Sequence, residues 1–165
     1  MANALDVVPE RQEIKTGVRN TQTIAEALAE VLSDTYALIL KTHAYHWNVE
    51  GPLFYSVHNL TEEQYTDMFE AADELAERIR ALGHLAPMKL SAITDTSIIA
   101  DRQTTPSAGE MCSDLAQNHE RVAHRLHALI EVAETNRDMV TADLATERSA
   151  FHEKAAWMLR ALSAQ

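Results

Sequence analysis

The sequence is poor in the residues that break helices or link chains covalently. Its 165 residues include one cysteine, four glycines and four prolines. The single thiol, Cys112, excludes an internal disulfide framework, suits a reducing compartment and is expected in the core as a small apolar side chain. Apolar residues make up 46% of the chain, which argues against a disordered or loop-rich protein. The length and composition together predict one compact helical domain.

Basic residues are also scarce. Lysine and arginine number 14 against 25 aspartates and glutamates, which leaves a net charge of -11. Such a surface repels nucleic acid and anionic membranes and attracts cations. The N-terminal stretch MANALDVVPERQEIKTG lacks the basic-then-apolar order of a signal peptide, and every apolar run is too short to cross a bilayer. We therefore expect a cytoplasmic protein with no membrane partner, and a cation as its first partner.

Helical periodicity begins after residue 20. Residues 1–20 have mixed charge and no period, which predicts an N-terminal tail followed by a single domain over 21–165. Four long amphipathic segments occur at about 23–47, 53–82, 105–133 and 137–162. Thr23 and Glu26 match a capping box at the start of the first segment, and the linker between the second and third has room for a short helix near 91–100. The sequence thus predicts an all-α, ferritin-like four-helix bundle with a short extra helix in that linker.

The second predicted helix carries apolar and metal-ligating residues on different faces. Its expected core stripe consists of Val57, Met68, Leu75, Ile79 and Leu82. Two pairs at i, i+4 spacing, His58 with Glu62 and Asp73 with Glu77, fall on an arc centred roughly 140° from that stripe. Each pair could hold part of a metal site, yet Glu62 and Asp73 stand about 16 Å apart along the helix. No single ion spans that distance, so each half requires a further contribution.

A second copy of the chain completes both halves in one arrangement. His58 and Glu77 lie equally far from the centre of the segment 58–77, and so do Glu62 and Asp73. Antiparallel packing of this helix on its own copy about a two-fold axis therefore places His58 opposite Glu77 of the partner subunit. The same register places Glu62 opposite the partner's Asp73. The sequence predicts two equivalent metal sites in a dimer interface.

Other residues bear on that hypothesis. Tyr65 and Phe69 lie along the same outward arc, where large aromatic side chains indicate a partner surface. His46 ends the first predicted helix, twelve residues before His58, so a helical hairpin brings both imidazoles toward one ion. Two imidazoles with three carboxylates suit iron(II) or zinc, and the share of acids favours iron. The alternative is that the acids and the histidine are ordinary decoration of an exposed helix.

Two stretches, HWNVEGPLFYSVHNLTEE and DELAERIRALG, resemble the Dps family, the mini-ferritins of the ferritin-like superfamily named as DNA-binding proteins from starved cells. The matching positions are His46, Trp47, Asn48, Gly51, Phe54, His58, Asp73, Glu77 and Arg78. The likeness covers about residues 23–162. It implies a four-helix subunit that assembles into a hollow dodecamer. In that family iron(II) is bound at two-fold sites between subunits, oxidised by hydrogen peroxide or oxygen, and stored as a ferric mineral.

Carried over by position, the resemblance implies His46, His58 and Glu62 as iron ligands from one subunit and Asp73 and Glu77 as ligands from its neighbour. The function implied is a ferroxidase and iron-storage protein that protects DNA by removing iron(II) and peroxide together. The alternatives are a nucleoid-compacting DNA-binding protein with secondary iron chemistry, and a bundle with structural zinc and no redox role.

This sequence departs from the family pattern in its ligands and in its tail. Glu62 stands where many members have aspartate, a change that keeps an oxygen ligand. His43, one turn before His46, occupies a position that is often basic, and it is either an added ligand or a neutral neighbour. The tail is balanced in charge, with Arg11, Lys15 and Arg19 against Asp6, Glu10 and Glu13. DNA binding through a lysine-rich tail is therefore not expected.

The two tryptophans have different expected roles. Trp47 adjoins His46, and the resemblance implies that it passes an electron or quenches radicals at the iron site. A packing role in the interface is the alternative. Trp157 falls on the predicted apolar stripe of the last helix and is expected in the core.

Some histidines and acids lie outside the predicted site. His119, His124 and His127 have helical spacing, and we expect two solvated histidines and a partly buried His119 in preference to a second metal site. The resemblance implies ion-entry pores at three-fold axes, lined by acids near the start of the last helix. Asp138 and Asp143 are the candidates, and ordinary surface acids are the alternative.

Overall fold

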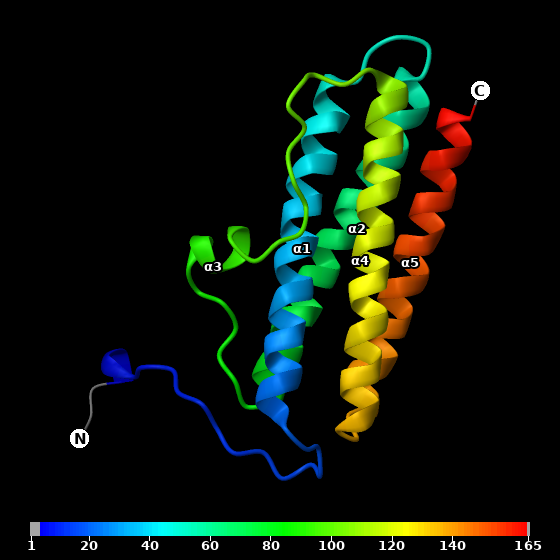
Figure 1. Ribbon diagram of the computed structural model, residues 1–165. Helices are drawn as coiled ribbons and strands as arrows, with labels where there is room; N and C mark the ends of the chain where they lie inside the picture. Colours follow the sequence, from blue (N-terminus) through cyan, green and yellow to red (C-terminus); the bar gives the residue numbers. More distant parts are fainter. Residues whose placement is uncertain (1–3, 165) are drawn as a thin grey trace.

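The computed structural model describes residues 4–164, which form an all-helical fold (Figure 1). The four long helices are α1 (Thr21–Asn48), α2 (Phe54–Ala81), α4 (Ala108–Thr135) and α5 (Met139–Ser163). Two short elements are the 3-10 helix η1 (Ala4–Asp6) and the linker helix α3 (Leu90–Thr94). No strand occurs within residues 4–164. The predicted four-helix bundle and its extra linker helix are confirmed, although α3 is shorter than the predicted segment 91–100.

The connection between α2 and α4 runs along the length of the bundle. α2 ends beside the start of α1, whereas α4 begins at the opposite end, so residues 82–107 pass along the outside of α1 (Figure 1). The buried carboxylate of Asp34 anchors this linker by accepting hydrogen bonds from Ser97 Oγ at 2.9 Å and from the Ile98 amide at 2.8 Å. Arg125 of α4 pairs with the same carboxylate at 2.8 Å. The crossing connection makes α2 and α4 parallel, as the predicted topology requires.

Two helices begin at positions other than those predicted. α1 starts at Thr21 after Asn20, which has φ 44° and makes no side-chain capping bond, so the predicted capping box at Thr23 is wrong. Asn20 instead donates to the Asn136 side chain at 2.8 Å, and this tertiary contact sets where the helix begins. α4 does start with a capping box, formed by Ser107 and Glu110. That start is later than the predicted one at residue 105, because this reciprocal pair satisfies the first free amides.

The second half of the predicted tail lies against the bundle. The Gln12 amide donates to the Gly83 carbonyl at 2.8 Å, and Ile14 and Val18 pack on the core. Gly83 has φ 85°, and a β-carbon at this position would collide with the Gln12 carbonyl. Glycine is therefore required both to end α2 and to admit the tail. Residues 1–3 of the predicted tail and residue 165 of the predicted domain lie outside the described residues.

Apolar stripes of the helices form the core. The five core residues predicted for the second helical segment are all buried, and so is Cys112. α5 differs from the prediction, because its buried face consists mainly of small side chains: Ala142, Ala145, Ala155 and Ala156. Trp157 is 63% exposed, so its predicted place in the core is wrong. A residue that directly follows the buried Ala156 is turned by about 100° around the helix, which carries Trp157 outward.

Candidate metal centre

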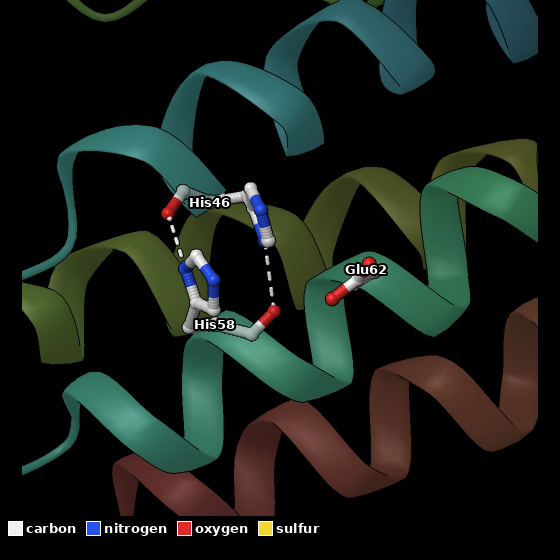
Figure 2. A group of neighbouring side chains, drawn as sticks. All are labelled: His46, His58 and Glu62. Atoms are coloured by element: carbon white, nitrogen blue, oxygen red, sulfur yellow. Dashed lines mark hydrogen bonds between the residues drawn. The ribbon is translucent and has the colours of Figure 1, made fainter.

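Two histidines from adjacent helices form the centre of the site. His46 lies near the end of α1 and His58 near the start of α2, and their rings stack with centroids 3.7 Å apart (Figure 2). A tight turn joins the two helices, with Gly51 at φ 87°, a conformation that favours glycine. The predicted helical hairpin therefore does bring the two imidazoles together.

Hydrogen bonds fix the orientation of both rings. His46 Nδ1 donates to the His58 carbonyl at 2.8 Å, and His58 Nδ1 donates to the His46 carbonyl at 3.0 Å (Figure 2). Because each Nδ1 carries a proton for its carbonyl partner, each neutral ring keeps the lone pair on Nε2. The reciprocal bonds prepare both Nε2 atoms as metal ligands, as hydrogen bonds to the second nitrogen do in known metal sites.

Glu62 adds a carboxylate to this pair. It lies one turn beyond His58 on α2, and one ligand atom from each of His46, His58 and Glu62 falls within 4.8 Å of the others. In the part of the chain that the structure describes, this is the one such group of three or more ligating side chains. His46 is buried, His58 is half-buried and Glu62 is exposed, so the group opens toward solvent.

Asp73 and Glu77 lie apart from this group. Both are exposed on α2, and Asp73 stands about 16 Å along the helix from Glu62. Phe69, between the two halves, is 60% exposed. One chain thus brings together three of the five predicted ligands and leaves two carboxylates facing outward, as the helical wheel predicts.

Aromatic rings surround the two histidines. The His43 ring lies between Trp47 and Tyr65, with centroid distances of 4.2 and 4.3 Å. It is not part of the three-residue group, and its centroid lies 6.0 Å from that of His46. Trp47 is 65% exposed, so within one chain its packing partner is His43.

Thr61 is a neighbour of the site that sequence reasoning missed. This fully buried residue places Oγ1 3.4 Å from His46 Nδ1 and 3.0 Å from the His58 carbonyl. The one hydroxyl proton is shared between the Val57 carbonyl at 2.6 Å and the His58 carbonyl, the carbonyl that orients His46. A threonine three residues after His58 is the only signal in the sequence, and such spacing is common in any helix.

Two of the other predicted groups need correction. Asp138 is only 1% exposed, caps α5 and accepts a hydrogen bond from Arg78 at 2.6 Å, so it is not an acid on an open surface. Burial tends to raise the pKa of Asp138, but the bonds from Arg78 and Thr141 outweigh burial and lower it. His119 is fully buried, not partly buried as predicted. Its Nδ1 lies 2.8 Å from His152 Nδ1.

The remaining members of these groups are exposed. His124 and Asp143 lie on the surface, and His127 pairs with Glu153 at 2.9 Å. His119, His124 and His127 therefore form no common site.

In the described part of the chain, no helix is long and apolar enough to cross a membrane.

A four-helix bundle with one full-length crossing connection is the topology of ferritin-like proteins. Residues 25–165 match the family model of the ferritin-like domain. The chain is 34% identical over 137 residues to the DNA protection during starvation protein of Helicobacter pylori, covering 82% of this chain and 95% of that one. The chain belongs to the Dps family of ferritin-like proteins.

Solved structures agree with this assignment. The crystal structure of Dps from Staphylococcus aureus superposes with a TM-score of 0.85 at 28% identity, covering 90% of this chain and 99% of that chain. The Dps protein of Vibrio cholerae O1 superposes with a TM-score of 0.81 at 26% identity, covering 90% and 98% of the two chains. The latter is described as a member of a broad superfamily of ferritin-like diiron-carboxylate proteins.

Proposed function

We propose that this protein oxidises iron(II) and stores the ferric product inside a hollow oligomer, which protects DNA from iron and peroxide. The observation that carries the proposal is the reciprocal pair of hydrogen bonds between His46 and His58. These bonds hold two imidazole rings beside the Glu62 carboxylate, in a group that opens toward solvent. Mixed nitrogen and oxygen ligands of this kind suit iron(II).

The iron ligands are His46, His58 and Glu62 of one subunit together with Asp73 and Glu77 of its two-fold neighbour. In the antiparallel register, the exposed Phe69 and the half-buried Tyr65 lie near the axis and supply apolar contact area. Each dimer then holds two equivalent sites, and no subunit holds a complete one. By resemblance, six such dimers form the dodecamer.

The ligand set favours loss of an electron from iron. Three carboxylates and two neutral imidazoles carry a charge that stabilises iron(III) more than iron(II). Two iron(II) ions each give one electron to hydrogen peroxide, which takes up two protons and becomes two water molecules. Oxygen is the alternative acceptor. Removing both iron(II) and peroxide removes the reactants that damage DNA, and the protein acts in the cytoplasm.

The two rival functions have less support. A structural zinc site is closed, with four protein ligands in a tetrahedron, whereas Glu62 leaves this group open to solvent. DNA compaction requires a basic surface, whereas the net charge is -11. Arg11 and Arg19 are exposed on the tail, but acids balance them.

Anaerobic titration with iron(II), followed by hydrogen peroxide, tests the proposal through ferric absorbance. The wild-type oligomer is expected to oxidise iron faster than buffer does and to keep the product soluble. His58→Gln is expected to lose most of that rate, and the exposed His124→Gln serves as a matched control that keeps it. A wild-type rate equal to that of buffer would reject the ferroxidase function.

A further inference from the structure

A layer of buried polar side chains crosses the interior of the bundle. It has one member from each long helix: Thr42 of α1, Gln64 of α2, His119 of α4 and His152 of α5. No more than 3% of any of these side chains is exposed. A buried polar group without hydrogen bonds costs free energy, so such groups in native proteins are almost always paired.

Contacts on α5 bring three of these residues to one level. His119 and His152 meet directly, with 2.8 Å between their Nδ1 atoms. Gln64 lines a groove of about 220 Å³ together with Phe151 and Ala155, which lie on either side of His152 along α5. The amide of α2 and the two imidazoles therefore lie in the same layer of the bundle.

Contacts of its neighbours place Thr42 in the layer as well. His43 stacks on Tyr65, the residue that follows Gln64. Lys41 pairs with Asp114 of α4 at 3.0 Å. Asp34 of the same helix pairs with Arg125, and α1 and α4 run antiparallel. Thr42 therefore lies between the levels of residues 113 and 117 of α4, about 3–9 Å from that of His119 along the bundle axis.

The polar atoms of this layer are not satisfied by the protein itself. Within residues 4–164, four buried side-chain atoms have no hydrogen-bond partner: Thr42 Oγ1, Gln64 Nε2, Gln64 Oε1 and His119 Nε2. All four atoms belong to residues of this layer, so the missing hydrogen bonds are concentrated in one region of the bundle. A chain of this length typically encloses about six buried water molecules, each bonded to such groups.

We propose that ordered water molecules bind in this layer and complete the hydrogen bonds of Thr42, Gln64 and His119. Water both donates and accepts, so it matches the hydroxyl, the two amide atoms and a ring nitrogen alike. Burial, followed by the charge of Arg148, lowers the pKa of His119 to about 3, so the ring is neutral at pH 7.

The chemistry of the layer favours water over a metal ion. Ferritin-like proteins that hold metal in the bundle core use inward glutamates together with histidines. This layer offers two imidazoles, an amide and a hydroxyl, with no carboxylate among them. Arg148, which pairs with Asp67, is the nearby charge that acts on both imidazoles. A divalent cation would enter without a neutralising partner, which is costly in a buried site.

Isosteric substitutions distinguish a hydrated layer from a dry one. Thr42→Val removes only the hydroxyl, and Gln64→Leu removes both amide atoms at similar volume. If water satisfies these atoms, each change is expected to lower the Tm of the assembled protein by about 2–4 °C. The exposed Thr146→Val on α5, away from the proposed dimer interface, is the matched control and is expected to leave Tm unchanged. An unchanged or higher Tm for both core variants would overturn the proposal, because apolar replacement of unsatisfied atoms stabilises a core.

Diffraction on the full wild-type chain provides a measurement that needs no variant. Crystals grown without added metal are expected to show solvent peaks about 2.7–3.2 Å from His119 Nε2 and from the Gln64 amide. A layer without such peaks would contradict the proposal. Crystals soaked in zinc(II) are expected to show no anomalous peak there, and a zinc peak between His119 and His152 would replace the water assignment with a metal site.

Discussion

Mixing two inactive variants tests whether each metal site is built from two chains. His58→Ala and Asp73→Ala each remove one ligand from every site of their own homodimers, so both are expected to be inactive alone. In a mixed dimer, both changes fall in one site and the second site keeps all its ligands. Equal mixing makes about half of the dimers mixed, so about a quarter of all sites are restored.

A site built from one chain alone would give a different fraction of intact sites after mixing. Within one chain, Asp73 lies about 16 Å along α2 from Glu62, so it cannot join the His46, His58 and Glu62 group. If all ligands nevertheless came from one chain, mixing the single variants would restore none of the sites. A double variant that carries both His58→Ala and Asp73→Ala gives a second readout. When it is mixed equally with wild type, about a quarter of the sites survive if they are shared, and about half if they are not.

The assay is the initial rate of ferric absorbance after disassembly, mixing and reassembly. Reassembled wild type sets the full rate, and each variant reassembled alone sets the background. Native mass spectrometry, with one variant isotopically labelled, measures the fraction of mixed dimers. Mixed dimers present at the expected fraction without recovered oxidation would refute the shared site.

Three further predictions concern stability and partners. Burial lowers the pKa of both His119 and His152, so below about pH 6.5 the unfolded chain binds protons that the folded chain does not. The free energy of unfolding should therefore be greatest above about pH 6.5 and fall as the pH drops from 6.5 toward 3. His119→Leu should reduce that slope by up to about 1.4 kcal/mol per pH unit in denaturant titrations, and an unchanged slope would show that His119 is not the group involved. Gly83→Ala should cost about 2 kcal/mol and expose the tail to protease, because alanine disfavours a positive φ and meets the Gln12 carbonyl; equal protease resistance would count against it. Gel shifts at physiological salt with divalent ions chelated should show no submicromolar DNA complex, since the net charge is -11, and a tight complex would contradict the charge argument.

Local patterns in the sequence determined most of the fold and the candidate ligands. Helical periodicity located the four long helices, because an apolar stripe must face the core wherever a helix packs. The same periodicity separated the buried Met68 from the exposed Asp73 and Glu77. Spacing across the short turn brought His46 near His58, since two helices joined by a few residues pack side by side.

The three-dimensional packing decided features that depend on residues far apart in the chain. Trp157 is exposed because small alanines fill the α5 face of the core. The apolar residues along one helix do not by themselves show which of them pack inward. Asn20 starts α1 through its bond to Asn136, which outweighs the local signal at Thr23. Helix ends are sensitive to such contacts because a single hydrogen bond there is comparable to the local preference.

The hydrogen bonding of the histidines shows the same division. The residue types and spacing of His46 and His58 mark them as candidate ligands, but the carbonyl bonds that hold each Nδ1 exist only once α1 and α2 pack together. His119 is predicted from the sequence to be partly buried, yet packing of α4 on α5 buries it fully against His152. Ligand identity is a property of single side chains, whereas protonation and orientation depend on neighbours that only tertiary contacts supply.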